Sequence, residues 1–305
     1  MTKVAAKDVP ASVRARLLAR SQRDGEDFQR TLLRYANERV LARIAESPHA
    51  DKFVLKGASL FALWIDAPHR PTRDIDLLGY GPRQPADWLP VFRDVCELSP
   101  TADDGLVLHA DSVQAALIRE DQTYEGVRVT LLATLGNAKI ALQVDIGYGD
   151  ATYPAPELTT LPSSLGLPAC TWRTYRRETV VAEKFHAMVV LGMGNSRMKD
   201  FFDVWTLQQH FAFDGALLGE AIRRTFERRA TPPPHEVPLA LTATFADDRS
   251  KRVQWTAFLA RNRLTAPELP VVVAALASFV LPAVDGFDVD GATARQWQPG
   301  GPWGR

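Results

Sequence analysis

The sequence is poor in cysteine and has no excess of charge of either sign. Its 305 residues include only two cysteines, Cys96 and Cys170. Two cysteines cannot build a zinc site or a disulfide framework, so we expect a reducing, cytoplasmic location. Lysine plus arginine and aspartate plus glutamate both number 36, which excludes an overall basic field for nucleic acid. An RNA ligand would therefore need a local basic patch.

Long hydrophobic runs are also lacking. The first ten residues, MTKVAAKDVP, contain no apolar core of a signal sequence. The apolar stretch Leu269–Val284 holds only 16 residues and contains Pro270 and Pro282. It is shorter than the roughly 20 residues that a membrane span requires. We expect a buried C-terminal helix there, and no membrane partner.

The most informative residues present are Asp74 and Asp76, which alternate with apolar residues in the run RDIDLL. In a strand, positions i and i+2 point to the same face. Two carboxylates about 6–7 Å apart on one face repel each other unless a cation lies between them. Oxygen ligands of this kind favour Mg²⁺, which takes further ligands from substrate phosphates. The alternative is a solvated edge strand, which is the commoner case for an isolated D-x-D.

The segment before these aspartates predicts a turn between a strand and a helix. Phe53–Leu55 is typical of a buried strand, Lys56–Ser59 of its exit turn, and the spacing of Leu60, Leu63 and Trp64 of a helix. A glycine in such a turn lets the backbone approach a ligand, and a helix N-terminus offers N–H groups to phosphate. Together with the aspartate strand, the turn predicts a metal-dependent nucleotide site.

A third acid, Asp145, lies on a predicted hairpin. Val127–Leu135 and Ala138–Ile146 are strand-like runs joined at Gly136-Asn137, a hairpin signal. Alternation places Asp145 and Gln143 on the face opposite the apolar residues. A carboxylate among apolar neighbours is costly unless it is paired or liganded. Asp145 could thus bind a catalytic metal or deprotonate an attacking hydroxyl. A surface-facing aspartate on a half-exposed hairpin is an equal alternative on this segment alone.

A second polar cluster occupies residues 178–209. Apolar spacing predicts a helix from Glu178 that carries Lys184 beside its apolar stripe, and a second helix that carries Lys199, Asp200 and Asp203. Lys184 could bind phosphate as a point charge, with Asp200 or Asp203 orienting the lysine or the nucleotide. The alternatives are a solvated helix lysine and a surface pair between Lys199 and Asp203.

Five motifs, in this order along the chain, resemble the AbiEii family of nucleotidyltransferase-like toxins. They are LKGA at 55–58, RPTRDIDLLG at 70–79, QVDIG at 143–147, AEKFHA at 182–187 and NSRMKDFFD at 195–203. The family belongs to type IV toxin–antitoxin and abortive-infection systems and includes the MenT toxins. The resemblance spans roughly residues 10–280. It implies a bilobed α/β nucleotidyltransferase fold, with a DNA polymerase β-like catalytic sheet and a mostly helical C-terminal lobe.

The resemblance also implies an activity and its partners. The expected reaction is Mg²⁺-dependent transfer of a nucleoside monophosphate from an NTP to an RNA, which in the MenT branch is the tRNA 3′ end. A cognate antitoxin encoded alongside is the expected protein partner. Two alternatives stay open. One is an enzyme of the same fold that modifies a small molecule or a protein. The other is a catalytically idle nucleotide-binding partner in a defence complex, which the three intact acids disfavour.

The matching positions assign roles to individual residues. The resemblance implies that Asp74, Asp76 and Asp145 are the metal ligands, in a two-metal site for Mg²⁺ or Mn²⁺. It also implies that the same acids act in catalysis with Lys184 and Asp200. The expected nucleotide-binding residues are Lys56, Gly57, Ser59, Thr72, Arg73, Lys184, Lys199 and Asp203. One position departs from the wider superfamily, because Ala58 stands where a second glycine or a serine is usual. We therefore expect Ser59 to contact phosphate.

Two arginine clusters are candidates for the basic patch. Arg173, Arg176 and Arg177 come just before the Lys184 helix and are the predicted RNA-binding residues. The second cluster is better explained by a solvated helix face; it comprises Arg223, Arg224, Arg228 and Arg229.

The expected organisation has four parts. Residues 1–49 form N-terminal helices, about Ala11–Arg20 and Asp27–Glu46, that pack on a catalytic lobe of residues 50–153. A crossover punctuated by prolines at 154–168 is the predicted boundary. A mostly helical lobe follows at 169–284, and residues 285–305 form an irregular tail.

Overall fold

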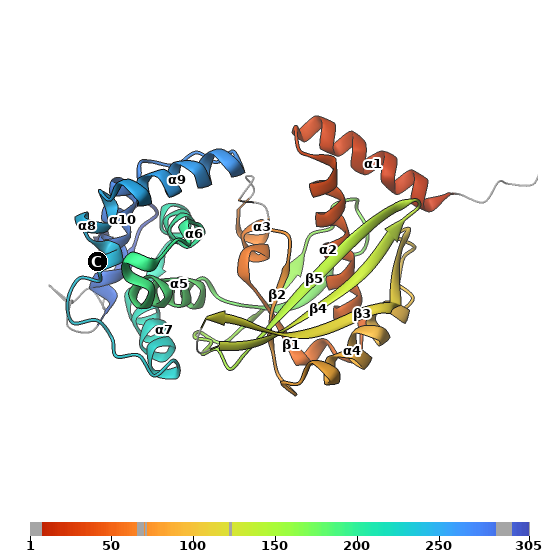
Figure 1. The fold of residues 1–305 in the computed structure, drawn as a ribbon, viewed down its shortest axis with the longest axis horizontal. Coiled ribbons are helices and arrows are strands. Elements are labelled where there is room, and N and C mark those ends of the chain that lie inside the picture. The colour runs from red at the N-terminus through yellow and green to blue at the C-terminus, as the bar shows by residue number, and fades with distance from the viewer. Residues whose placement is uncertain (1–7, 66–69, 71, 122–123, 285–294, 305) are drawn as a thin grey trace, which may run out of the picture. The chain divides into compact units, whose positions relative to one another are not determined.

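The computed structural model describes residues 8–65, 70, 72–121, 124–284 and 295–304. The chain divides into two compact units. The sheet unit comprises Met1–Gly149 and Glu157–Thr174, and the helical unit comprises Asp150–Pro156 and Tyr175–Arg305. The division differs from the predicted boundary at 154–168, because the chain enters the helical unit briefly and then returns to add two strands to the sheet. Figure 1 follows the chain through both units.

The sheet unit is built on a mixed sheet, which among the described residues has seven strands in the order β3-β4-β5-β2-β1-β7-β6. β1 pairs antiparallel with β2 and parallel with β7, and β2 pairs parallel with β5. The strands are β1 (Phe53–Lys56), β2 (Ile75–Gly79), β3 (Leu106–Asp121), β4 (Tyr124–Leu135), β5 (Ala138–Tyr148), β6 (Glu157–Leu161) and β7 (Cys170–Thr174). The helices are α1 (Val9–Asp24), α2 (Phe28–Glu46), α3 (Phe61–Trp64) and α4 (Pro85–Glu97).

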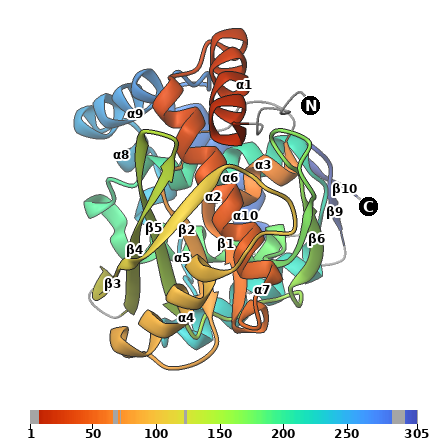
Figure 2. The same cartoon turned by 90° about the vertical axis from the view of Figure 1, so that its right-hand side faces the viewer.

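One face of this sheet is apolar and is covered by helices. Ile75, Leu77, Val144 and Ile146 are completely buried on it. α2 contacts β5 and β7, and α4 contacts β3 and β4, so both helices lie across the sheet (Figure 2). The apolar spacing of α2 explains this packing, since Leu32, Ala36, Val40 and Ile44 are all buried. By alternation, the polar residues of β2 and β5 lie on the opposite face.

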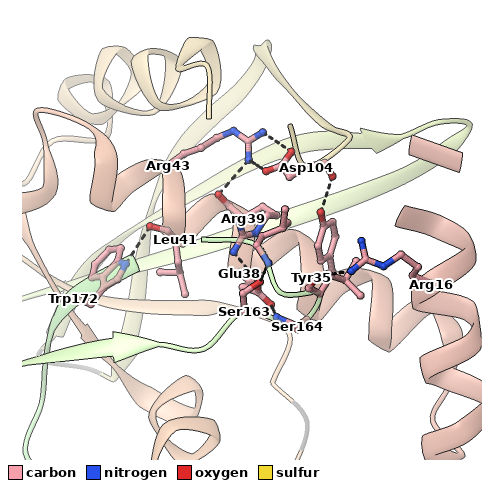
Figure 3. Close-up of polar contacts among 12 residues, drawn as sticks. Arg16, Tyr35, Glu38, Arg39, Leu41, Arg43, Asp104, Ser163, Ser164 and Trp172 are labelled. Carbon is pink, nitrogen blue, oxygen red and sulfur yellow. Dashed lines mark hydrogen bonds and ion pairs between the residues drawn. The ribbon is translucent and has the colours of Figure 1, made fainter. Parts of the chain in front are cut away.

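Polar contacts fix α2 in place (Figure 3). The guanidinium of Arg43 forms two hydrogen bonds with the Asp104 carboxylate, at 2.8 and 3.0 Å. Tyr35 donates its hydroxyl proton to the Asp104 carbonyl at 2.6 Å, and Trp172 of β7 donates to the Leu41 carbonyl at 3.1 Å. Burial and the nearby Asp104 charge raise the pKa of Tyr35. α2 therefore has one fixed position on the sheet.

The helical unit follows the pattern expected for the C-terminal lobe. Its helices are α5 (Arg177–Leu191), α6 (Met198–His210), α7 (Gly215–Arg228), α8 (Ala243–Ala246), α9 (Arg249–Asn262) and α10 (Leu269–Val280). α10 is the expected buried C-terminal helix, with Val272, Leu276 and Phe279 fully covered. Within the described residues, no helix combines the length and apolarity needed to cross a lipid bilayer.

Part of the expected irregular tail is ordered. β9 (Gln296–Trp297) and β10 (Trp303–Gly304) pair with each other, and β9 pairs with β8 (Phe213–Asp214). Trp297 is buried against Phe279, at 4.9 Å between ring centroids, and donates its indole N–H to the Gln208 carbonyl at 2.8 Å. Aromatic burial thus holds these residues in place. Residues 285–294 and 305 lie outside the described residues.

Candidate functional site

Predicted site residues from three strands share the polar face of the sheet. β2 lies between β1 and β5, and Asp76 is opposite Lys56 of β1 on one side and Asp145 of β5 on the other. The flanking Ile75 and Leu77 are fully buried on the other face. The interior position of β2 rules out the solvated edge strand as an explanation of D-x-D. Lys56, Asp76 and Asp145 form one row across neighbouring strands.

Gly57 occupies the turn that follows β1, and its missing side chain is required there. Its backbone has φ +74°, and a Cβ built on it would lie 2.1 Å from Oδ2 of Asp76. Only glycine accepts both the left-handed conformation and this close approach. The turn that is predicted to bind phosphate therefore also lies directly against the Asp76 carboxylate. After Gly57–Leu60, the predicted helix is short and contains only Phe61–Trp64.

Asp145 is paired with an arginine from the neighbouring strand. Nε and Nη2 of Arg128 donate to its two oxygens, each at 2.8 Å, and the Gln143 amide lies 3.2 and 3.1 Å from the same oxygens. Asp145 is only 7% exposed, so the surface-facing alternative is wrong. The bidentate contact offsets the cost of burying the carboxylate and fixes its orientation.

Arg128 was not predicted as a site residue, although the register of the predicted hairpin places it opposite Asp145. The two-residue turn Gly136-Asn137 places Leu135 opposite Ala138. Counting back equally from the turn along both strands reaches Arg128 opposite Asp145, as the register shows. Directly opposite charges on antiparallel strands are close enough to pair. The predicted hairpin therefore also identifies Arg128 as the partner of Asp145.

The segment before β2 carries Thr72, Arg73 and Asp74. The Thr72 hydroxyl donates to the Asp74 carbonyl at 3.2 Å, which closes a tight local turn. Asn37 of α2 donates its amide proton to the Arg73 carbonyl at 3.1 Å. α2 therefore positions the backbone from which Asp74 projects. Asp74 is half-buried, and Arg73 is exposed.

The donor set fits a divalent cation in part. Carboxylate oxygens are the ligands that Mg²⁺ prefers, and Mg²⁺ usually takes only one or two carboxylates from a protein. Asp74 and Asp76 supply these. Both oxygens of Asp145 already accept hydrogen bonds from Arg128 and Gln143. In the part of the chain that the structure describes, no group of three aspartate, glutamate, histidine or cysteine side chains is arranged to hold a metal.

The second cluster lies in the helical unit and centres on Lys184 of α5. Its Nζ is 2.7 Å from Oδ1 of Asp200 and 2.8 Å from Oδ2 of Asp203, both on α6. The side chain of Lys184 is 13% exposed, whereas both carboxylates are completely buried. The alternative of a solvated helix lysine is therefore wrong. Asp203 is completely buried against Lys184, so a surface pair with Lys199 does not by itself account for this aspartate.

Asp200 stays ionised although it is buried. Burial alone would raise the pKa of its carboxyl, but the charges of Lys184 and Arg197 outweigh this effect and lower it. Nε of Arg197 lies 2.8 Å from Oδ2 of Asp200, although neither atom has a partner with hydrogen-bond geometry. This contact is therefore a charge interaction. The cluster holds two completely buried carboxylates against two cations that are partly exposed.

A buried lysine of α9, also missed from the sequence, supports the start of α6. Lys251 is 6% exposed and donates from Nζ to the Asn195 carbonyl at 2.9 Å. Asn195 in turn accepts the Arg197 backbone N–H on its side-chain oxygen at 2.8 Å. α9 thereby fixes the loop from which α6 presents Asp200 and Asp203.

The three predicted RNA-binding arginines have different surroundings. Arg173 of the sheet unit donates to the backbone carbonyls of Asp51 and Phe53, at the start of β1 and away from Gly57. Arg176 and Arg177 belong to the helical unit. The Arg177 guanidinium lies 4.3 Å from the centre of the Phe211 ring, and Nε of Arg176 is 3.9 Å from Glu178. Arg173 thus contacts backbone carbonyls, whereas these contacts of Arg176 and Arg177 are with side chains.

The arginines of the second cluster also differ in their surroundings. Arg223 and Arg224 pair with Glu220 on the exposed surface of α7, as a solvated helix face predicts. Arg229 instead contacts buried Asp150 at 3.5 Å and Nδ1 of His186 at 3.2 Å.

Comparison with known proteins places these features in a family. No curated protein matches the chain. Two solved structures are similar to it. One, described as a candidate nucleotidyltransferase from H. pylori, has a TM-score of 0.41 and 16% identity, and the match covers 80% of this chain and 94% of that chain. The other, JHP933 from Helicobacter pylori, has a TM-score of 0.39 and 16% identity, with 80% and 91% coverage. At such low scores neither likeness carries an argument about fold or function.

The family model described as nucleotidyl transferase AbiEii toxin, type IV TA system, matches residues 39–286. This range includes all the candidate metal, catalytic and nucleotide-binding residues of both units. It also confirms the resemblance inferred from the five sequence motifs. The chain belongs to the AbiEii family of nucleotidyltransferase toxins of type IV toxin–antitoxin systems.

Proposed function

We propose that this toxin transfers a nucleoside monophosphate from an NTP to an RNA acceptor, the 3′ end of tRNA. The observation that carries the proposal is the row formed by Lys56, Asp76 and Asp145 on three neighbouring strands. Asp74 lies two residues before Asp76. Such a row brings several charges together on one face of the sheet, which supports the binding of a triphosphate and an attacking hydroxyl there.

In the proposed reaction, the acceptor hydroxyl oxygen forms a bond to the α-phosphorus. The bond from that phosphorus to the oxygen bridging to the β-phosphate breaks, and pyrophosphate leaves. Asp145 accepts the hydroxyl proton, in the orientation that Arg128 and Gln143 give its carboxylate. Lys56 and the backbone around Gly57 and Ser59 bind the triphosphate.

The carboxylates of Asp74 and Asp76 would hold Mg²⁺, with Mn²⁺ as the alternative ion. When bound, a divalent ion neutralises phosphate charge and supports an in-line displacement. Thr72 and Arg73 support this position through the backbone geometry that Asn37 fixes. Asp145 is the third carboxylate of the proposed active site, beside Asp74 and Asp76.

Lys184, Asp200 and Asp203 are proposed to act in the same transfer. Lys184 supplies a positive charge for phosphate, and the two buried aspartates hold its ammonium in one position. Lys199 is the exposed lysine of this motif and is proposed to contact nucleotide. The proposed protein partner is the cognate antitoxin, and the proposed location is the cytoplasm.

Label transfer tests the proposal. The pure protein is incubated with total RNA, Mg²⁺ and each of the four NTPs, labelled at the α-phosphate, and the products are separated by size. We expect label in a tRNA-sized band and no label there with Asp76→Asn. Label in a small molecule or in a protein would replace RNA as the acceptor. No label in any product would contradict the proposed transfer.

A further inference from the structure

A pocket of about 390 Å³ opens on the sheet unit beside Asp74, and most of its lining has no role in the function proposed above. Its lining includes Leu33 of α2, Arg73 and Asp74 of the segment before β2, and Gln114, Thr130 and Gln143 of three neighbouring strands. The volume falls within the roughly 300–1,000 Å³ that is usual for small-ligand sites. The pocket is large enough for a nucleoside.

Three neutral polar side chains form a row across this pocket. Gln114 of β3 is opposite Thr130 of β4, which is opposite Gln143 of β5. Residues directly opposite each other in a sheet point to the same face. Within the described part of the chain, no hydrogen bond holds the side chains of Gln114 or Thr130. Their donors and acceptors are therefore available to a ligand.

A β-bulge shapes the same pocket. The register of β3 against β4 shifts between His109 and Gln114. In this interval the Ser112 hydroxyl donates to the His109 carbonyl at 2.5 Å and accepts the Leu132 backbone N–H at 2.8 Å. Ser112 and Leu132 both line the pocket. Bulges re-aim side chains and are over-represented beside active sites.

The chemistry of the lining favours a nucleobase. A carboxamide and a hydroxyl each offer both a donor and an acceptor, and nucleobase edges present donors and acceptors side by side. Leu33 and Leu132 add apolar surface for the face of a base. Arg73 is the lining's one basic side chain and Asp74 its one acidic side chain. These opposite charges balance, and the rest of the lining is uncharged, as suits a nucleobase.

We propose that this pocket binds the base of a nucleoside, and that the nucleoside is the terminal one of the RNA acceptor. The assignment to the acceptor rests on the proposed function. Gln143 of the row donates to Asp145, the carboxylate proposed to receive the proton of the attacking hydroxyl. Residues two apart on a strand are separated by roughly 6–7 Å. A base on the row therefore brings its ribose hydroxyls toward Asp145.

The test measures binding by two variants that leave the catalytic residues intact. Gln114→Ala and Thr130→Val each remove hydrogen-bonding atoms from the row, and valine suits a strand. Gln22→Ala is the matched control, because Gln22 is exposed in the same unit and does not line the pocket. The probes are fluorescent pentaribonucleotides that end in each of the four nucleosides. Dissociation constants for the four NTPs are measured in parallel.

We expect each row variant to raise the pentaribonucleotide Kd about fivefold to tenfold, the usual effect of one lost hydrogen bond. Discrimination among the four 3′ nucleosides should also fall, while NTP affinities and the control stay within about twofold of wild type. A rise in NTP Kd alone would support base binding and assign the pocket to the NTP. Unchanged affinity for both probes would overturn the proposal. Because binding is measured without turnover, failure of RNA labelling would reject the proposed function separately.

Discussion

The contacts of Lys184 give this residue a role in the stability of the fold as well as its predicted role in phosphate binding. Its ammonium is the shared partner of Asp200 and Asp203, which are both completely buried. Removing one member of a buried ion pair typically costs about 3–5 kcal/mol, because the remaining charge stays buried without compensation. A substitution here therefore affects both transfer and the stability of the fold.

We predict that Lys184→Ala lowers the free energy of unfolding by about 3 kcal/mol, measured by urea denaturation. Lys199→Ala is the matched control, since Lys199 belongs to the same motif and is exposed. It should change stability by less than about 0.5 kcal/mol. Equal, small effects of both substitutions would contradict the network seen around Lys184.

His186 provides a residue-scale prediction about pH. Burial, and then the charge of Arg229, lower its pKa from 6.5 to about 4. Below pH 6.5 the unfolded chain therefore binds a proton that the folded protein does not, and stability falls with pH until about pH 4. The loss from this group is at most about 3 kcal/mol. Urea denaturation at several pH values should show a smaller decline for His186→Gln than for wild type. Equal declines would contradict the lowered pKa.

The turn between β1 and β2 gives a prediction at the scale of elements. Gly57 and Gly166 have similar backbone angles, φ +74° and +70°, but of the two only Gly57 has atoms within 4 Å of the position that a Cβ would take, namely those of Asp76. Gly166→Ala should cost about 1 kcal/mol from the left-handed conformation and leave transfer intact. Gly57→Ala should cost more and abolish transfer, because the methyl group displaces the carboxylate. Similar activity in both variants would contradict this role for the turn.

Elements governed by local pattern could be predicted from the sequence. α2, the β4–β5 hairpin and the buried helix α10 all follow from apolar spacing or turn chemistry. The hairpin also placed Asp145 correctly. Partners supplied by distant segments could not be found in this way. The contact between Lys251 and Asn195 joins residues far apart in sequence, and no spacing rule connects them.

The difference between local patterns and long-range contacts also explains why the two units do not follow the predicted boundary. Prolines at 154–168 indicated a crossover, but they could not show that Glu157–Leu161 pairs with Cys170–Thr174 as part of the first sheet. Likewise, the Gly- and Pro-rich composition after residue 284 predicted an irregular tail. Burial of Trp297 against Phe279 outweighs that local preference. In both cases, contacts between distant segments determine a structure that local composition does not predict.

At the scale of the whole molecule, the balanced charge means that RNA binding depends on a local patch of basic residues. With 36 basic and 36 acidic residues, the chain has no general field to compensate for a lost patch. Arg173 donates to backbone carbonyls at the start of β1, so a double reversal at Arg176 and Arg177 tests the predicted patch without breaking that contact. Each phosphate contact on a single strand contributes about −0.7 to the log–log slope of affinity against salt.

We predict that Arg176→Glu with Arg177→Glu weakens tRNA binding and flattens its salt dependence, while NTP affinity is retained. Fluorescence titration at several salt concentrations measures both quantities. Arg249→Glu is the control, because Arg249 is an exposed arginine on another helix of the same unit. An unchanged slope in the double variant would show that RNA docks elsewhere.

The most direct test of the central claim is the single-turnover rate of label transfer by Asp74→Ala and Asp76→Ala in Mg²⁺. Both residues are half-buried, Asp76 on β2 and Asp74 just before it, so neither substitution opens the apolar core. We predict that each variant loses transfer while its thermal unfolding stays close to that of wild type. Near wild-type transfer by either variant would contradict the assignment of these carboxylates as the catalytic centre.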